Sequence, residues 1–547
     1  MRRRNFIQIT STASVLSLFP SEVFALFKSA GMTTCPDVIS KKIVLIQLSG
    51  ANDGLNTIIP INQYDTYASL RPNIKLNNIG ASNGIINLDS TLALTDQVGL
   101  HPSLTGFKSL YDSGFMRVIQ GVGYPFQNKS HFKSTDLWLT GGDGTTANNS
   151  LTSGWIGRFL EHYYSNFLTS NFPLGIQLGN SDNSLGFYGE VEHNMSLNIT
   201  GQSPSGFYSV VNGLGGSPPT AIPKSEYGDL IQFIINNDAA TNTYAQTISN
   251  SFNTGSNSIP YPNTTLANQL KTVARFISGG LQTKVYLVKL GGFDTHNLQV
   301  AANDTTHLGA HAALLTQLSE AVNAFIIDLN NQNLGNDVVS VTFSEFGRKA
   351  GENASLGTDH GEIAPVFVFG NSITPGISGT NVNLSEAVAG NGYQIKTVQH
   401  DYRRVFSTIL QDWFGTSNQT LDLSFYNYTN NTGFSNNKIV DLIKPQYVVN
   451  SSCYTNSTLS INEFKKPAEA IVYPNPASEL ITINLHNNNE IYSASLFSLD
   501  GKLIAKFNNP QIGNQYSINV QNIPSGFYFL KIETDKGSLS KKIIIRR

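Results

Sequence analysis

Two Asp/His pairs, each close to glycine, are the residues of this sequence best suited to chemistry. Asp359 and His360 are adjacent in GTDHGE, and Asp294 and His296 lie two positions apart in GGFDTHNLQ. A carboxylate oxygen and an imidazole nitrogen are natural ligands of a Zn-like ion, at about 2.0–2.2 Å. A lone Asp-His dipeptide is more often a turn or a cap. Two such pairs beside predicted strands favour a divalent metal site, with zinc as the expected ion.

Two further residues extend this candidate ligand set. Asp53, in SGANDGLN, supplies a fifth ligand and allows for one or two ions, because paired ions hold the attacking and leaving oxygens of a displacement. His311 lies on the apolar stripe of a predicted helix, shortly after Asp294 and His296. It either completes the metal shell or is a buried histidine, with its hydrogen bonds satisfied, near a helix start. The sequence leaves both interpretations open.

Ser130 and Arg348 are the candidates for catalysis. Ser130 follows a predicted strand and opens the predicted helix SHFKSTDLWLT. A hydroxyl at a helix N-terminus, next to a metal, suits nucleophilic attack on a phosphate or sulfate ester. A plain N-cap serine is an equally good interpretation. Arg348, in SEFGRKAGEN, either holds an anionic group through two hydrogen bonds or pairs with Glu345.

The elements that position these residues alternate in an α/β pattern. Nearly continuous apolar runs predict buried strands at residues 42–48, 115–122, 284–290, 337–343 and 364–370. Between the third and fourth runs, one apolar stripe predicts a helix containing Leu308, Leu315, Leu318, Val322, Phe325 and Leu329. This order predicts a mostly parallel sheet. Ligands bind beyond the carboxyl ends of such strands, where the polar clusters fall.

The composition limits the classes of function. The chain has 547 residues, enough for two or three domains, and only 13% of them are charged. The net charge of −2 gives no electrostatic footprint for nucleic acid, so no nucleic-acid partner is expected. No window offers about 18 uninterrupted apolar residues, so no transmembrane helix is expected. Cys35 and Cys453 fit one disulfide or two free thiols equally well.

Five ordered motifs between residues 40 and 415 resemble those of the domain-of-unknown-function family 1501, which is placed near the sulfatase-like and alkaline-phosphatase superfamily. The motifs are LIQLSGANDGLNTIIP, NKSHFKSTDLW, GGFDTHNLQ, FSEFGRKAGENASLGTDHG and DYRRVFSTILQDWFG. The resemblance implies an alkaline-phosphatase-like α/β/α sandwich. Asp359 and His360 then match the superfamily's Asp-His-Gly metal motif, and Asp294 with His296 resembles its other ligand pair.

The sequence departs from the superfamily's pattern in several places. The superfamily has Asp directly after the first strand, where this chain has Ser49, so Asp53 is a shifted candidate. In the superfamily the second Asp/His pair is four residues apart, whereas Asp294 and His296 of this chain are two residues apart. No motif fixes the nucleophile, and His400, beside Asp401, is a candidate for the last histidine ligand.

Both ends of the chain resemble export signals. RRNFIQ and the apolar stretch after it resemble a twin-arginine signal within residues 1–30, with a basic N-terminal arm as the alternative. Residues 471–547 predict a small β-sandwich from short runs and turn signals. There VYPNPASELITI, SLDGKLI, IPSGFYFLKI and the ending KKIIIRR resemble a type IX secretion sorting domain. This resemblance implies the type IX secretion machinery as a partner, and a secreted or cell-surface location outside a Gram-negative cell.

These features predict four segments and two alternative functions. The segments are an export signal at 1–30, an α/β domain at 40–415, a linker at 416–470 and the β-sandwich at 471–547. The first function is a secreted metal-dependent hydrolase of phosphate or sulfate esters, with an unidentified anionic ester or glycan as substrate. The alternative is a non-catalytic secreted or surface protein that keeps the fold and binds glycans or partners. The Asp/His pairs favour the first, and the missing first-strand Asp favours the second.

Overall fold

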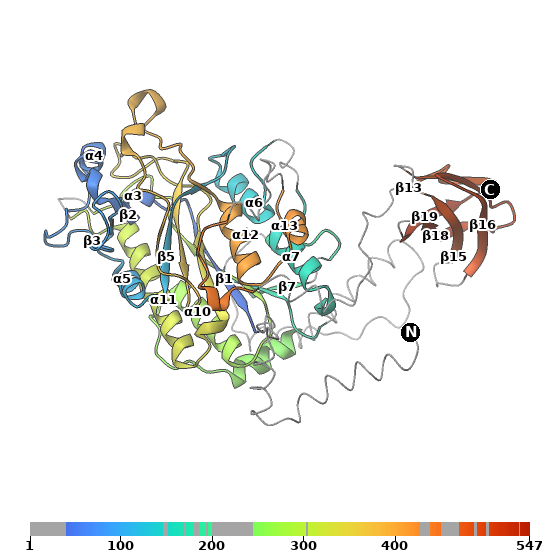
Figure 1. Cartoon of the computed structure of the whole chain (residues 1–547), viewed down its shortest axis with the longest axis horizontal. Helices are drawn as coiled ribbons and strands as arrows, with labels where there is room; N and C mark the ends of the chain where they lie inside the picture. Colours follow the sequence, from blue (N-terminus) through green and yellow to red (C-terminus); the bar gives the residue numbers. More distant parts are fainter. Residues whose placement is uncertain are drawn as a thin grey trace. The chain divides into compact units, whose positions relative to one another are not determined.

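A computed structural model shows the architecture of the chain (Figure 1). The chain forms two compact units, Met1–Tyr454 and Thr455–Arg547, and each is described by itself. The structure describes residues 40–145, 151–168, 170–179, 185–192, 195–199, 244–301, 305–426, 438–449, 470–485, 490–498, 503–534 and 537–546. The predicted export signal at 1–30, and Cys35 and Cys453 with their two alternatives, lie outside these residues.

A nine-stranded sheet forms the centre of the larger unit, in the order β11-β5-β10-β9-β1-β8-β6-β7, with β12 also paired to β5. The five predicted runs form β1 (Lys42–Ser49), β5 (Met116–Gly123), β8 (Val285–Gly291), β9 (Val338–Phe343) and β10 (Ala364–Phe369). The other strands are β6 (Gly175–Leu178), β7 (Ser196–Ile199), β11 (Gly376–Ser378) and β12 (His400–Asp401).

Strand β10 runs opposite to the rest of this sheet. β1 is parallel to β8 and β9, β6 is parallel to β7 and β8, and β5 is parallel to β11 and β12. β10 lies between β9 and β5 and is antiparallel to both. β5 therefore has the same direction as β9, and the sheet is mostly parallel, as predicted. The reversal places the residues before β10 at the edge where the other strands end.

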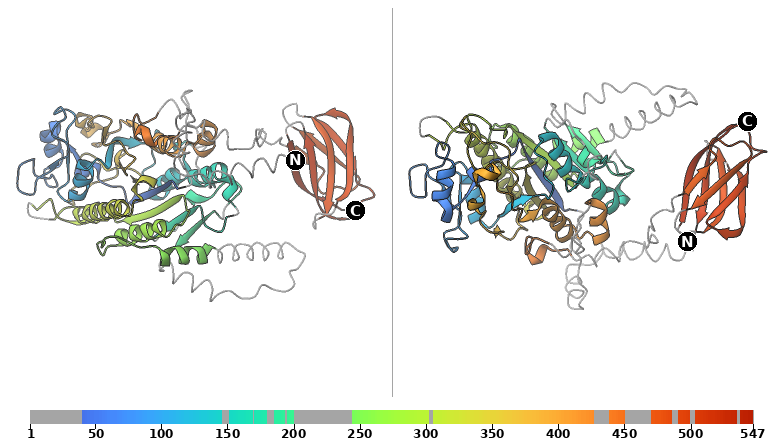
Figure 2. Two further views of the ribbon diagram at one scale, coloured as in Figure 1. Left: turned by 60° about the horizontal axis from the view of Figure 1, so that its bottom comes forward. Right: turned by 90° about the horizontal axis from the view of Figure 1, so that it is seen from above.

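Helices cover both faces of the sheet (Figure 2). In β1, Val44 and Ile46 pack into one hydrophobic core, and Ile43 and Leu45 pack into another on the opposite face. The first core includes side chains of α5 (Thr105–Asp112), α10 (Thr265–Ser278) and α11 (Ala310–Asn331). The second includes side chains of α6 (His131–Thr140), α7 (Trp155–Tyr163), α12 (Tyr402–Asp412) and α13 (Asn418–Ser424). The predicted α/β class is confirmed, with the sheet between two helical layers.

The predicted apolar helix is α11, which packs against α5 and α10. Leu308 lies outside it and is half exposed, because the helix begins only after Gly309, whose φ is 118°. The other stripe residues are buried, namely Leu315, Leu318, Val322, Phe325 and Leu329. Among the described residues, α11 is the one helix long and apolar enough to cross a membrane. Its burial within the first core is that of a core helix.

The larger unit extends beyond the predicted boundary at residue 415. α13 packs against α7, and Leu442 and Ile443 lie in the same core as α12. The Asn-, Ser- and Thr-rich composition of this segment predicted a linker. Several of its apolar side chains nevertheless anchor it in the core, among them Leu421, Phe425 and Ile439, whereas Leu423 and Val440 are exposed.

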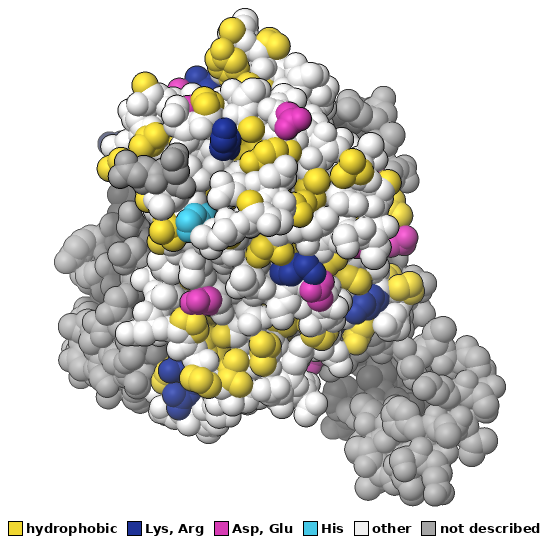
Figure 3. Space-filling model, turned by 90° about the vertical axis from the view of Figure 1, so that its left-hand side faces the viewer, with side chains coloured by type: hydrophobic (Ala, Val, Ile, Leu, Met, Phe, Trp, Pro, Cys, Tyr) yellow, Lys and Arg dark blue, Asp and Glu magenta, His cyan; other side chains and the backbone are white. Residues whose placement is uncertain are grey.

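The larger unit also shows the polar, weakly charged surface that the composition predicts. Figure 3 shows one face, on which charged side chains lie singly or in small groups among polar and hydrophobic atoms.

The larger unit also contains a separate three-stranded sheet, made of β2 (Ile58–Pro60), β3 (Ile86–Asn87) and β4 (Val98–Leu100).

The smaller unit is all-β, as predicted. One antiparallel sheet contains β13 (Ala470–Tyr473), β14 (Leu480–Leu485) and β17 (Gln515–Asn519). The other contains β15 (Ile491–Ser498), β16 (Leu503–Gly513), β18 (Gly526–Thr534) and β19 (Gly537–Ile545). Alternate residues such as Ile481 and Ile483, or Leu530 and Ile532, are buried in a core of its own.

Candidate metal centre

Four loops bring the chemically capable side chains to one edge of the large sheet. His131 begins α6 after β5, Asp294 and His296 follow β8, and Glu345 follows β9. His360 precedes β10, and the reversed direction of that strand brings it to the same edge. In open α/β sheets this carboxyl edge is where ligands bind. The predicted convergence of separate strand-end clusters therefore has a topological cause.

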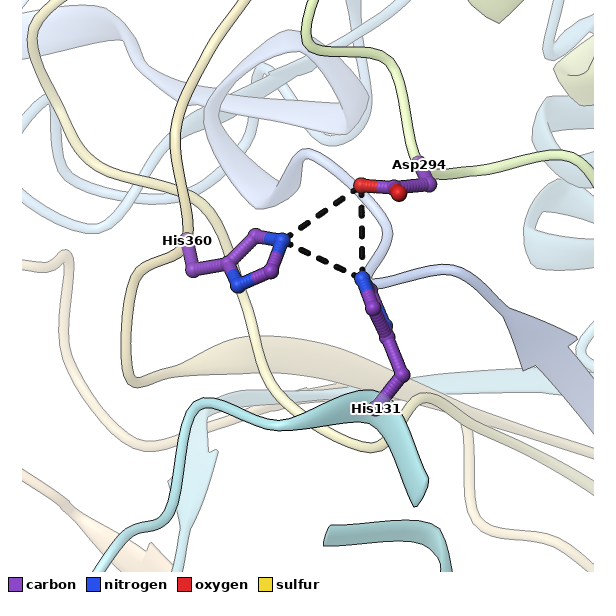
Figure 4. A group of neighbouring side chains, drawn as sticks. All are labelled: His131, Asp294 and His360. Atoms are coloured by element: carbon purple, nitrogen blue, oxygen red, sulfur yellow. Dashed lines mark hydrogen bonds and ion pairs between the residues drawn. The ribbon is translucent and has the colours of Figure 1, made fainter. Parts of the chain in front are cut away.

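Three side chains from three of these loops meet at one point (Figure 4). His131 Nε2 lies 3.3 Å from Asp294 Oδ1, and His360 Nε2 lies 3.4 Å from the same oxygen. The two imidazole nitrogens are 3.1 Å apart. Ligand atoms about 2.0–2.1 Å from a tetrahedral zinc ion lie roughly 3.3 Å from one another. The three atoms are therefore spaced as ligands of one zinc-like ion are.

His296 lies against the same cluster. Its Nε2 atom is 2.9 Å from His360 Nε2 and 3.1 Å from Asp294 Oδ1. His296 therefore contacts two of the three converging atoms and is a candidate fourth ligand.

The Nδ1 atom of each imidazole, on the side of the ring away from the cluster, faces an oxygen atom. His131 Nδ1 lies 2.8 Å from Glu345 Oε1, and His360 Nδ1 lies 2.8 Å from the carbonyl oxygen of Lys129. His296 Nδ1 lies 3.5 Å from Asp359 Oδ1. Carbonyl and carboxylate oxygens accept hydrogen bonds, so the network assigns the proton of each neutral ring to Nδ1. Metal-binding histidines are held by partners of this kind.

This tautomer leaves lone pairs facing one another at the centre of the cluster. His360 Nε2 is close to two other imidazole nitrogens, and lone pairs at such distances repel unless a positive charge lies between them. A proton on one ring or a shared metal ion supplies that charge. Hydrogen bonding to Glu345 raises the pKa of His131, whereas burial lowers the pKa of His360. The donor set of imidazoles and one carboxylate fits a zinc-like ion.

Asp294 is ionised well below neutral pH. Its partial burial acts to raise its pKa, but the hydrogen bond and charge of Arg348 lower the pKa to about 2, with help from His131 and His296. Arg348 Nη2 lies 2.6 Å from Asp294 Oδ1. The carboxylate is thus available as a metal ligand at any physiological pH.

Arg348 takes neither of the two roles that the sequence predicted. Its guanidinium is not placed to hold a substrate anion, and it does not pair with Glu345. Its buried guanidinium donates to Asp294 and to four backbone carbonyls, those of Gly50, Ala51, Phe293 and Thr358. These acceptors belong to the loops after β1 and β8 and to the loop before β10. Arg348 therefore binds the three loops together.

Asp359 supports the cluster from outside the group of three converging atoms. Its Oδ1 atom faces His296 Nδ1 and accepts a hydrogen bond from the Asn353 amide at 3.2 Å. Its Oδ2 atom lies 3.2 Å from the Lys349 ammonium. Partial burial acts to raise the pKa of Asp359, but the hydrogen bonds from Asn353 and Lys349 lower it below its usual value.

Asp53 lies apart from the converging atoms, in a buried ion pair. Arg71 donates two hydrogen bonds to its carboxylate, at 2.6 and 2.9 Å, and Gln299 donates a third. Gln299 also accepts hydrogen bonds from the hydroxyls of Thr295 and Thr358. Asp53 thus connects the two loops that carry the Asp/His pairs, and its lone pairs are engaged within the chain.

His311 is buried, as in the second of its two predicted roles, but only one of its ring nitrogens has a hydrogen-bond partner among the described residues, and Nδ1 has none. Its Nε2 atom lies 3.0 Å from Asn52 Oδ1, and burial lowers its pKa to about 4. His400, the candidate last ligand, lies on β12 with its Nδ1 atom 3.4 Å from the Arg404 guanidinium. Neither residue belongs to the group formed by His131, Asp294 and His360.

Ser130 is the exposed N-cap residue of α6, directly before His131. Its hydroxyl makes no hydrogen bond to the amides of the first turn, so the structure does not show the capping contact of the alternative interpretation. Its neighbour Lys129 supplies the carbonyl that holds His360.

Sequence reasoning missed the roles of His131 and Glu345. His131 was visible beside Ser130, at the start of a helix after a strand, but it has no Asp or His at a ligand-like spacing. Glu345 lies at the end of β9, and only the fold brings its carboxylate to His131, 214 residues away. The signal that could have found both residues was their position just after a predicted strand, rather than their spacing from other metal-ligating residues.

Family comparisons identify two parts of the chain. Residues 471–546 match the secretion system C-terminal sorting domain. The chain is therefore exported and has a secreted or cell-surface location, and the type IX secretion machinery is its implied partner. Residues 240–420 match DUF1501, a protein of unknown function. The DUF1501 match includes Asp294, His296, Asp359 and His360, and it begins after Asp53 and His131 in the chain.

Among solved structures, the chain is similar to a lipoteichoic acid synthase from Listeria monocytogenes, with 11% identity, 62% of this chain and 67% of that chain covered, and a TM-score of 0.26. A protein in the alkaline phosphatase superfamily from Vibrio parahaemolyticus has 9% identity, with 86% and 78% covered and a TM-score of 0.30. A sulfatase from Pseudoalteromonas sp. has 10% identity, with 88% and 84% covered and a TM-score of 0.30. No curated protein sequence matches the chain. These structural likenesses are weak, and the side chains of the site are the better guide to its chemistry.

Proposed function

We propose that His131, Asp294 and His360 hold one divalent metal ion, with zinc as the expected ion, and that the site hydrolyses phosphate or sulfate esters. The observation that supports this most is the convergence of imidazole Nε2 atoms on one carboxylate oxygen, with each Nδ1 atom facing an oxygen. A single ion is proposed because Asp53 lies outside the group of converging atoms and both of its carboxylate oxygens accept hydrogen bonds from Arg71 and Gln299. When bound, such an ion acts as a Lewis acid toward an ester oxygen.

The chain's own residues prepare the site for this ion. Glu345 and the carbonyl of Lys129 keep two imidazoles aimed at the centre, and Asp359 faces the third, that of His296. Arg348 keeps Asp294 ionised and fixes its loop. Preorganised ligands of this kind need no rearrangement when substrate arrives.

Ser130 is the proposed nucleophile. Its hydroxyl is exposed and makes no capping hydrogen bond, and it directly precedes the ligand His131. An anionic ester bound near Ser130 would face the first-turn N–H groups of α6, since a helix N-terminus favours negative charge. In the proposed step the Ser130 oxygen attacks the phosphorus or sulfur atom, the bond from that atom to the ester oxygen breaks, and the alcohol leaves with the proton given up by the hydroxyl. Water then releases phosphate or sulfate from Ser130 and restores the hydroxyl.

A non-catalytic metal protein is the second candidate, and one observation favours it. Arg348, the cation nearest Asp294, is directed at the chain's own backbone rather than outward. In that case the ion would join the loops of the sheet edge, and the exported chain would bind glycans or partner proteins.

Metal analysis and esterase assays on the full chain separate the two candidates. We expect about one zinc ion per chain, and hydrolysis of 4-nitrophenyl phosphate or 4-nitrophenyl sulfate that is lost with a chelator and restored by zinc. His360→Ala should lose both the ion and the activity, because it removes the Nε2 atom that contacts His131, His296 and Asp294. Ser130→Ala should lose activity but keep the ion.

The matched control is His162→Ala, which removes an exposed imidazole from the last turn of α7. This variant should keep metal and activity. A wild-type chain without stoichiometric metal would overturn the proposed site. Stoichiometric metal without hydrolysis of either ester would favour the non-catalytic candidate.

A further inference from the structure

A cavity of about 490 Å³ opens beside the metal cluster. His296, Asp359 and His360 form its wall on the side of the cluster, and the segment from Asn391 to Gln394 lines another side. A molecule bound by the cluster would therefore extend into this space. The charges that line the cavity indicate which molecules fit there.

Three lysines line the cavity, and they come from three separate segments. Lys129 lies between β5 and α6, Lys349 follows β9, and Lys396 precedes β12. The lining contains one carboxylate, Asp359. In a chain with only 13% charged residues, three ammonium groups around one cavity are a local concentration of positive charge.

The three lysines differ in how far their charge is balanced. Lys129 lies 3.1 Å from Glu362, and Lys349 lies 3.2 Å from Asp359. Lys396 is exposed, and among the residues that the structure describes no carboxylate lies within ion-pair distance of its ammonium. A flexible ammonium of this kind acts as a point charge for phosphate, sulfate or carboxylate groups.

We infer that this cavity binds a second anionic group of the substrate, next to the ester held at the metal cluster, so that the substrate class is polyanionic esters. The inference rests on the proposed hydrolysis for the identity of the first group. The second group is recognised through its charge, chiefly by Lys396, with Lys129 and Lys349 beside it, and belongs to the part of the substrate that extends away from the cluster. A singly charged ester leaves these lysines unused.

Binding of inositol hexasulfate to the full chain tests this without requiring turnover. Isothermal titration at low salt should show tighter binding of inositol hexasulfate than of inorganic sulfate, because several sulfates engage several lysines. Lys396→Ala should weaken hexasulfate binding about fivefold at low salt, since an ion pair of an exposed ammonium contributes up to roughly that factor. Lys396→Glu should weaken it further.

The matched control is Lys271→Ala, which removes an exposed lysine of α10 that does not line the cavity. It changes the net charge equally and should leave hexasulfate binding within about twofold of wild type. Equal losses in Lys396→Ala and Lys271→Ala would overturn the inference, as would equal affinity for the two anions in the wild type. If binding follows the lysines but no ester is hydrolysed, the proposed activity fails and the anion cavity stands.

Discussion

At the scale of single residues, the candidate metal centre depends on which nitrogen of each histidine carries the proton. Three oxygen atoms decide this, those of Glu345, the Lys129 carbonyl and Asp359. Each leaves an Nε2 lone pair directed at the cluster. The three Nε2 lone pairs and the Asp294 carboxylate are therefore directed at one point, where together they can bind a cation.

Replacing the carboxylate behind His131 tests this dependence. Glu345→Gln keeps the shape of a buried side chain but weakens its hold on the imidazole Nδ1 proton. We expect zinc affinity, measured by competition with a chromophoric chelator, to fall about 10–100-fold, as is typical when such supporting partners are changed. Glu320→Gln, at an exposed position of α11, is the control and should leave the affinity unchanged. Equal affinity in both variants would contradict the role given to Glu345.

At the scale of elements, the site depends on how closely the loops at the sheet edge approach one another. Gly50, in the turn after β1, has a φ of 116°, and its N–H donates to Glu345 at 2.8 Å. A Cβ at this position would lie 2.4 Å from the backbone nitrogen of Asp294. The turn after the first strand therefore controls the position of the central carboxylate.

Gly50→Ala should consequently displace Asp294. We expect zinc binding to fall by more than tenfold and the melting temperature to drop, because backbone atoms cannot yield as flexible side chains can. Gly280→Ala is the matched control, since Gly280 also has a positive φ, of 82°, but a Cβ there would meet no other atom within 4 Å. Both variants carry a conformational cost of about 1–2 kcal/mol, so Gly50→Ala is distinguished by its loss of zinc and by the additional fall in melting temperature that the backbone clash causes. Similar zinc affinity in the two would contradict the argument.

The positions of the strands and of α11 along the chain could be predicted from the sequence, but the direction in which each strand runs in the sheet could not. The five apolar runs and the stripe from Leu315 to Leu329 predicted five strands and α11, because side-chain periodicity follows burial directly. The reversal of β10 had no local signal, since an apolar run looks the same in either direction. The pairing of Asp53 with Arg71 was also hidden, because it depends on a fold that turns Arg71 inward.

At the scale of the whole molecule, the chain has two units with separate cores. The core of the smaller unit contains residues 470–545 alone, and the cores of the α/β unit contain none of them. All the candidate metal ligands lie in the larger unit. A ligand that binds only one folded unit stabilises only that unit.

Calorimetry of the full chain should therefore show two unfolding transitions that respond differently to metal. Zinc in excess should raise the melting temperature of the transition with the larger enthalpy, which belongs to the larger unit. The other transition should stay in place. A chelator should reverse the shift. Equal shifts of both transitions, or none, would contradict a metal site confined to the α/β unit.

A shared metal ion bound by His131, Asp294 and His360, with His296 beside them, is the feature on which the proposed chemistry depends. X-ray absorption spectroscopy of the zinc-loaded full chain tests it most directly, because imidazole ligands have a characteristic scattering signature. We expect about one zinc per chain, bound by nitrogen and oxygen at about 2.0–2.1 Å, with at least two imidazoles, and the loss of this signature in His360→Ala. A zinc spectrum without imidazole ligands, or one unchanged in His360→Ala, would contradict it.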